Sequence, residues 1–198
     1  MFPTLVWKIQ LKPDLHQTIG AKIVRALERM RRGLPQLEPG HGWQSEPVLH
    51  EREEFQQLAV CVKDAAKSVL RFLRIGYEHF EITGCWATVL APGASHKLHS
   101  HPNNFLSGVY YVRTGEGADT INFHDPRSQA SVIRPPVVEL TGENTDQVVV
   151  RVSDGTLLLF PSWLEHSVDA NRSDDERISI SFNLMFSSFA QRLSKPLW

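Results

Sequence analysis

Apolar residues recur at three- and four-residue steps in the first third of the chain, which is the period of an amphipathic helix. A weaker series of this kind predicts a helix over 15–31, with Asp14 placed to cap its first turn. Residues 2–11 alternate loosely and could form a short strand, and 33–45 is rich enough in Gly and Pro to be a loop. The strongest series predicts a helix over 52–73, and its apolar members are Phe55, Leu58, Ala59, Val62, Ala65, Ala66, Val69, Leu70 and Leu73.

After about residue 76 the pattern changes to short runs of Val, Ile, Phe, Tyr and Trp, separated by Gly, Pro, Asp and Asn. Such runs are typical of strands joined by turns. A mainly β fold is therefore predicted, a sandwich or jelly roll (77–190) with the helices of 1–76 packed outside it in a single domain. A long surface loop is expected over 134–147. The predicted strands are 80–89, 106–112, 120–123, 148–152, 156–160 and 178–186.

Composition narrows the class of protein. The chain has 198 residues, enough for one domain with a substantial core. Its 21 Lys and Arg against 22 Asp and Glu give a net charge of −1, and this lack of a basic excess argues against nucleic acid as a partner. No apolar run is long enough to span a membrane. The start of the chain does not resemble a signal peptide, and Cys61 and Cys85 cannot make a disulfide framework, so we expect a cytoplasmic protein.

A histidine pair is the first candidate for chemistry. Residues i and i+2 of an extended strand point to the same side, so His99 and His101 can face one metal ion together. Imidazole suits iron, zinc, copper and nickel, so the pair alone does not choose the ion. His166 follows an apolar strand that ends at Pro161, and it is the expected third ligand.

A second pair is suited to an anion. Arg177 and Ser179 are also two residues apart on a predicted strand. The guanidinium can grip two carboxylate oxygens, and the hydroxyl can add one hydrogen bond. The simpler alternative is an arginine at the start of a strand that pairs with a nearby acid, namely Asp174, Asp175 or Glu176.

Together these segments resemble the iron(II)/2-oxoglutarate-dependent oxygenases, and most closely a family of small members with similar HxHP, SGVYY, FPSWLEHSV and ERISISFN segments. The likeness covers most of residues 40–186. It implies a double-stranded β-helix, the cupin-like jelly roll, with Fe(II) at one mouth. The implied enzyme is a dioxygenase that uses O₂ and decarboxylates 2-oxoglutarate to succinate while it oxidises, usually by hydroxylation, a small organic substrate. In this chain the four segments are residues 99–102, 107–111, 160–168 and 176–183.

The resemblance also implies roles for single residues. His99 and His166 would be the first and last iron ligands. Arg177 would hold the distal carboxylate of 2-oxoglutarate, with Ser179 beside it. Tyr110 or Tyr111 would face this cosubstrate, with Tyr111 preferred, unless both are core aromatics. Three further residues are candidates for contact with the substrate or for a place at the mouth of the site, although each could equally be an ordinary surface or turn residue: Arg127, Asn103 and Trp163.

One position departs from the superfamily pattern. The middle metal ligand is usually Asp or Glu, the residue of the facial triad that suits non-haem iron, but this chain has His101 there. Three neutral imidazoles leave the charge of the ion uncompensated until an anion such as 2-oxoglutarate arrives. We expect His101 to be a ligand. The alternative is that His101 lies behind the ligands and that water or Asp125 completes the site.

Two other classes of function stay open. In a cupin-type three-histidine dioxygenase that does not use 2-oxoglutarate, Gly93 with His99 and His101 would open the first motif, and Gly155 with His166 would belong to the second. The glutamate that cupins usually carry after the histidine pair is missing, and a cupin does not need the arginine–serine pair. The other alternative is a jelly roll that binds a metal or small ligand without catalysis. The sequence leaves open the substrate, the native metal and a homodimer formed through the helix of 52–73.

Overall fold

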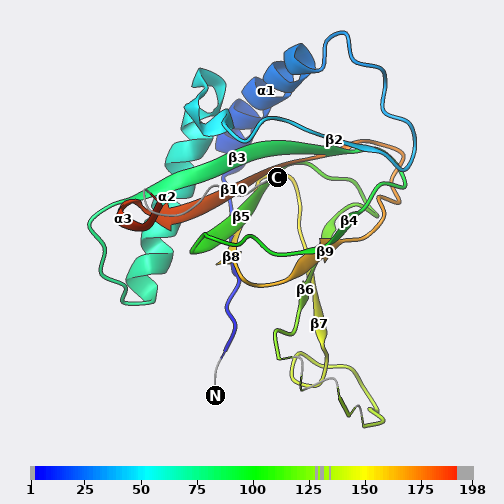
Figure 1. Cartoon of the computed structure of the whole chain (residues 1–198). Coiled ribbons are helices and arrows are strands. Elements are labelled where there is room, and N and C mark those ends of the chain that lie inside the picture. Colours follow the sequence, from blue (N-terminus) through cyan, green and yellow to red (C-terminus); the bar gives the residue numbers. More distant parts are fainter. Residues whose placement is uncertain (1–2, 128, 130–131, 134, 191–198) are drawn as a thin grey trace.

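The computed structural model describes residues 3–127, 129, 132–133 and 135–190 (Figure 1). Two antiparallel sheets form the body of the protein. The major sheet has the order β1 (Trp7–Gln10), β8 (Thr156–Pro161), β5 (Leu106–Arg113), β10 (Arg177–Phe186), β3 (Phe80–Leu90) and β2 (Gly42–Gln44). The minor sheet has the order β4 (His96–His99), β9 (His166–Val168), β6 (Thr120–His124) and β7 (Gln147–Arg151). This arrangement is the predicted jelly roll.

The helices cover one face of the major sheet, and the minor sheet lies against the other (Figure 1). Apolar residues of α1 (Pro13–Met30) and α2 (Gln56–Phe72) share one core with the major sheet, to which Ile23, Val62 and Ile180 belong. A second core lies between the sheets and contains Tyr111 and Phe160. Shorter helical segments are η1 (Leu49–Glu51), η2 (Glu53–Phe55) and α3 (Ser187–Ala190). None of the described helices is long and apolar enough to cross a membrane.

Strand β10 passes through the middle of the major sheet, between β5 and β3. Its even-numbered apolar residues, Ile178 to Leu184, are buried in the core on the helix side. Because side chains alternate along a strand, Arg177 and Ser179 point to the opposite side, toward the minor sheet. The alternation of β10 therefore places both polar residues between the two sheets.

A glycine lets the centre of the major sheet close up. A Cβ at Gly108 of β5 would lie 2.3 Å from the carbonyl oxygen of Leu158 and from the Phe182 ring. Any residue with a Cβ at this position would force the neighbouring strand to shift. The glycine of the SGVYY segment thus has a packing role.

The six predicted strands are all present, with bounds within two residues of those expected, and both helices are confirmed. The prediction that Asp14 caps the first helix is wrong: Lys12 is the N-cap residue without a side-chain cap, and Pro13, whose fixed φ suits the first helical turn, begins the helix. The second helix begins at Gln56 because the residues before it form two 3₁₀ turns. Strands β2, β4 and β9 were not predicted, since three or four residues give too short a pattern.

Candidate metal centre

Three histidines from two distant segments meet between the sheets. His99 ends β4 and His166 begins β9, and the two are direct partners in the antiparallel register, with ring centroids 4.3 Å apart. His101 follows β4 by two residues, and its ring lies 5.0 Å from that of His99 and 5.1 Å from that of His166. One ligand atom of each residue lies within 4.8 Å of the others. The predicted trio therefore forms a cluster with the donors of a metal site.

Backbone carbonyls orient two of these rings. The Nδ1 of His99 lies 2.7 Å from the carbonyl oxygen of Lys97, and the Nδ1 of His166 lies 2.9 Å from that of Leu164. A carbonyl can only accept, so each Nδ1 carries the hydrogen and each Nε2 keeps its lone pair. This second hydrogen bond is the usual companion of a metal-binding histidine.

The third ring is positioned through its backbone. The N–H of His101 donates to the carbonyl oxygen of Ser162 at 2.8 Å, which ties the residue to the end of β8. Burial lowers the pKa of His101 to about 3 and that of His166 to about 4, with a smaller contribution from neighbouring histidines. Both rings are therefore neutral at pH 7 and can bind a cation without first losing a proton.

A buried cation lies between the same sheets. Arg177 is 3% exposed, and its guanidinium carbon lies 5.1 Å from the centroid of the Tyr111 ring. One Nη donates to the carbonyl oxygen of Thr120 at 3.4 Å, while Nε and the Tyr111 hydroxyl are buried without a partner. Ser179 is also buried, next to Tyr111 in the register.

No ion pair joins Arg177 to a carboxylate in the part of the chain that the structure describes. Glu176, one of the acids suggested as its partner, instead makes two 2.8 Å bonds to Arg31 at the end of α1. A buried charge without a counter-charge is costly. The unpaired guanidinium, the orphaned phenol and the neutral imidazoles are together suited to an anion that also binds a metal ion.

The two tyrosine candidates face opposite ways. Tyr111 is in the core between the sheets, whereas Tyr110 is in the core on the helix side, and its hydroxyl lies 2.7 Å from Nδ1 of His16. Burial raises the pKa of both phenols. Only Tyr111 therefore lies on the side that holds Arg177.

The other candidates lie at the surface. Arg127 is exposed and bonds the Asp125 carboxylate at 3.0 and 2.7 Å, so this acid is engaged away from the histidines. Asn103 is exposed and occupies a left-handed turn, with φ of 64°. Trp163 is 56% exposed in the turn between β8 and β9. Their proposed contacts with a substrate stay predictions.

Two residues near the cluster were not among the predicted site residues. His96, at the start of β4, has its ring 5.0 Å from that of His99, and the amide nitrogen of Gln44 lies 3.2 Å from its Nε2. Burial is also the main cause that lowers the pKa of His96, to about 4. The signal for His96 in the sequence is the crowding of histidines there, since His96, His99, His101 and His124 fall within 29 positions.

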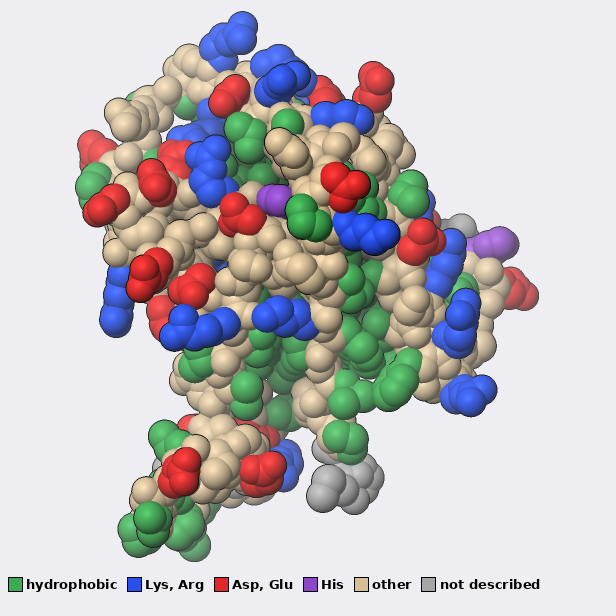
Figure 2. All heavy atoms as spheres, turned by 180° about the vertical axis from the view of Figure 1, so that it is seen from behind, with side chains coloured by type: hydrophobic (Ala, Val, Ile, Leu, Met, Phe, Trp, Pro, Cys, Tyr) green, Lys and Arg blue, Asp and Glu red, His purple; other side chains and the backbone are tan. Residues whose placement is uncertain are grey.

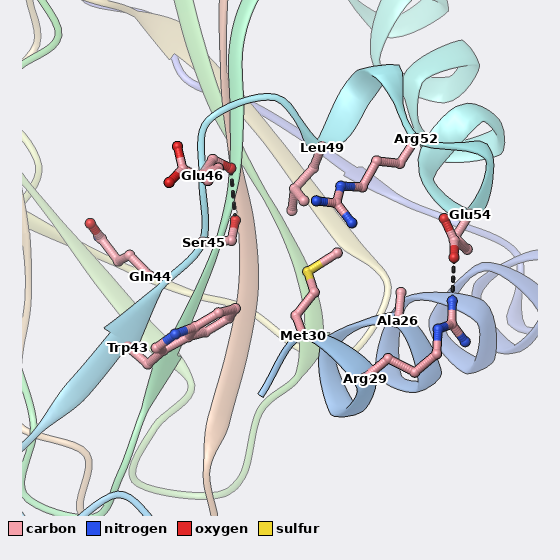
Figure 3. A pocket seen from close by; sticks show the side chains of 10 residues that line it. All are labelled: Ala26, Arg29, Met30, Trp43, Gln44, Ser45, Glu46, Leu49, Arg52 and Glu54. Atoms are coloured by element: carbon pink, nitrogen blue, oxygen red, sulfur yellow. Dashed lines mark hydrogen bonds and ion pairs between the residues drawn. The ribbon is translucent and has the colours of Figure 1, made fainter. Parts of the chain in front are cut away.

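A cleft of about 500 Å³ lies elsewhere, between α1 and the segment from β2 to η2 (Figure 3). Trp43 and Met30 form part of its lining, and Arg29 and Glu54 form an ion pair at one side. None of the predicted site residues lines it. Its lining does include Gln44, whose amide nitrogen lies near Nε2 of His96, so the cleft comes close to the histidine cluster at this one residue.

Comparison with known protein families gives a match that covers half of the chain. Residues 84–183 match the family model described as "Putative 2OG-Fe(II) oxygenase". This range is 100 of the 198 residues and contains all three histidines, Arg177 and Ser179. A search of curated protein sequences finds no match.

Solved structures share the fold at low sequence identity. SnoK, an α-ketoglutarate-dependent carbocyclase of nogalamycin biosynthesis, is 15% identical, with a TM-score of 0.67 over 98% of this chain and 89% of that one. HygX from Streptomyces hygroscopicus, with nickel and 2-oxoglutarate bound, is 13% identical, with a TM-score of 0.62 over 93% and 83%. A prolyl-4-hydroxylase from Pseudomonas putida is 17% identical, with a TM-score of 0.58 over 92% of each chain. At these identities the likeness concerns the fold.

Proposed function

Because the chain belongs to the family of 2OG-Fe(II) oxygenases, we propose that it oxidises a small organic substrate at an iron ion held by His99, His101 and His166. Membership of the family makes it a 2-oxoglutarate-dependent dioxygenase, with Fe(II) as cofactor and 2-oxoglutarate and O₂ as cosubstrates. The assignment of these residues and the nature of the substrate are the proposed part.

One observation supports the assignment above all others: a buried, unpaired arginine shares the space between the sheets with the histidine cluster. Arg177 and Ser179 would hold the distal carboxylate of 2-oxoglutarate, and the hydroxyl of Tyr111 would donate to it. Charge supports the same arrangement, because three neutral imidazoles leave both positive charges of Fe(II) to be balanced by the cosubstrate dianion. This would explain how the site works with His101 in place of an acid.

When bound, iron and 2-oxoglutarate supply the oxidation of an unactivated C–H bond, coupled to release of CO₂ and succinate. The protein binds and orients the iron, the cosubstrate and the substrate, and it keeps water away from them. The rings of Phe160 and Phe123 lie 4.8 and 6.2 Å from that of His166, on the inner side of the cluster. These apolar rings would keep water from the ligands on that side.

The substrate is proposed to be a small molecule or a short peptide segment. Structural relatives include a prolyl hydroxylase from Trichoplax adhaerens in complex with a peptide fragment and HygX with hygromycin B bound, so the fold is known with bound molecules of both kinds. The net charge of −1 gives no preference for a strongly charged partner. Hydroxylation is the expected outcome.

Titration of 2-oxoglutarate into the Fe(II) protein under anaerobic conditions tests this function. We expect the visible charge-transfer band of a keto acid chelated to iron, and succinate formation once O₂ is admitted. The missing carboxylate ligand gives the alternative of a three-histidine dioxygenase without 2-oxoglutarate some support. Iron binding with neither the band nor succinate would contradict the proposed function and favour the alternatives that do not use 2-oxoglutarate.

A further inference from the structure

His96 lies next to the histidine cluster. Its ring is 5.0 Å from that of His99. It is the register partner of Val168 in β9, whose side chain packs into the core between the sheets. The ring therefore lies beside the histidine cluster, on the side of β4 that faces the core between the sheets.

Gln44 fixes the orientation of this ring. Strand β2 lies at the edge of the major sheet, and the amide nitrogen of Gln44 lies 3.2 Å from Nε2 of His96 and 3.3 Å from the hydroxyl of Thr88. An amide nitrogen donates, so Nε2 is the acceptor and the ring hydrogen is on Nδ1. Thr88 is buried and is the register partner of Ser179 on β10. Gln44 thus connects His96 to the strand pair that carries the anion-binding residues.

His96 is not part of the metal cluster. Among the described residues, the histidines whose ligand atoms come within 4.8 Å of one another are His99, His101 and His166. The Nε2 of His96 is already engaged by Gln44. What this ring can offer the site is therefore one N–H donor at Nδ1.

We propose that His96, oriented by Gln44, is an additional cosubstrate-binding residue whose Nδ1–H donates to a carboxylate oxygen of 2-oxoglutarate. The inference rests on the proposed function, since it needs the cosubstrate to lie between the metal and Arg177. His96 contacts the cosubstrate directly. Gln44 is a positioning residue that acts through His96 by holding the proton on Nδ1.

The affinity for 2-oxoglutarate tests the role of His96. The dissociation constant is measured by anaerobic titration of the Fe(II) protein, followed by the visible band and by calorimetry, with metal content determined separately. His96→Phe keeps a ring but removes the donor, and should raise the dissociation constant about tenfold or more with one iron per chain retained. His96→Asn, whose amide nitrogen can replace Nδ1, should recover part of the affinity. The matched control is His79→Phe, at an exposed histidine before β3, which should change nothing.

Gln44→Leu tests the positioning step. It should weaken 2-oxoglutarate binding in the wild-type background and add nothing in the His96→Phe background, whereas a purely structural role would make the two effects additive. An unchanged affinity in His96→Phe, or loss of iron from it, would overturn the inference. If the wild-type protein binds iron but develops no band with 2-oxoglutarate, it is the proposed function that fails, so the two failures are distinguishable.

Discussion

His99 and His166 are paired directly across β4 and β9, with their ring centroids 4.3 Å apart. The register of the minor sheet, whose strands β4 and β9 lie above β6 and β7 in Figure 1, thus sets the spacing of two proposed ligands. Backbone pairing holds the two imidazoles in position before a metal ion binds. Less conformational entropy is therefore lost when the ion binds.

Removal of either ligand should remove the metal. We expect His99→Ala and His166→Ala each to lose stoichiometric iron while the far-ultraviolet circular dichroism stays that of the wild type. Elemental analysis of protein purified anaerobically measures this, with His79→Ala as the control at an exposed histidine. Full metal content in both variants would show that the ligands lie elsewhere.

The buried arginine should control affinity for the cosubstrate. Arg177→Ala removes the unpaired guanidinium, and the dissociation constant for 2-oxoglutarate should rise by one to several orders of magnitude, or about 2–5 kcal/mol. Arg151→Ala, at an exposed arginine paired with Asp119, should leave it unchanged. Equal affinities in the two variants would contradict the role of Arg177.

The neighbouring tyrosines give a matched pair of variants. Tyr111→Phe removes a buried hydroxyl without a partner, so 2-oxoglutarate binding should weaken about tenfold if the phenol donates to the carboxylate. Tyr110→Phe breaks the contact with His16, and should lower the free energy of unfolding by about 1 kcal/mol without an effect on the cosubstrate. Calorimetric titration and urea denaturation of both variants separate the two roles, and a reversed result would assign the cosubstrate to Tyr110.

The ion pair between Arg31 and Glu176 should stabilise the fold in a pH-dependent way. The hydrogen bond from Arg31 lowers the pKa of Glu176 below its ordinary value near 4.5, so the folded state favours the charged form. The stabilisation is therefore present above pH 4.5 and is lost as the pH falls through the lower folded-state pKa. Glu176→Gln should cost about 1 kcal/mol at pH 7 and progressively less in acid, as measured by urea denaturation. A constant difference at all pH values would rule out this linkage.

The sequence predicted those parts of the site in which the spacing of residues along a strand and the chemistry of their side chains both indicate a shared role. For Arg177 and Ser179, the two-residue repeat of a strand was enough to predict a shared face. His99 and His101 also come together, but β4 ends at His99 and His101 is held beyond it by the hydrogen bond from its N–H to Ser162. The facing of Tyr110 and Tyr111 could not be predicted, because all of β5 except Arg113 is buried and shows no polar alternation. The two residues are distinguished only by the helices, which pack on the face of the major sheet that carries Tyr110.

The part of the site near His96 was beyond sequence reasoning for a different reason. The contact depends on β2, a strand of three residues that pairs with β3 across more than 40 positions. Such a strand carries almost no periodic signal, and its place is decided by tertiary packing. The contact between Arg127 and Asp125, in contrast, agrees with the turn role that the sequence analysis gave as the alternative for Arg127.

The surface carries a feature with no assigned role. The connection between β6 and β7 extends from the body, and green apolar side chains gather at its end in Figure 2. Among its described residues, Val132, Ile133, Val138 and Leu140 are 71% to 108% exposed. Its expected character as a surface loop is confirmed for residues 135–146.

The central place of β10 has a consequence for biosynthesis. The last described strand of the chain inserts between β5 and β3, two strands made much earlier, and it carries both Arg177 and Ser179. Until this segment has left the ribosome, the edges of β5 and β3 that pair with β10 in the native sheet have no native partner. Completion of the sheet and arrival of the anion-binding side chains are therefore a single folding event.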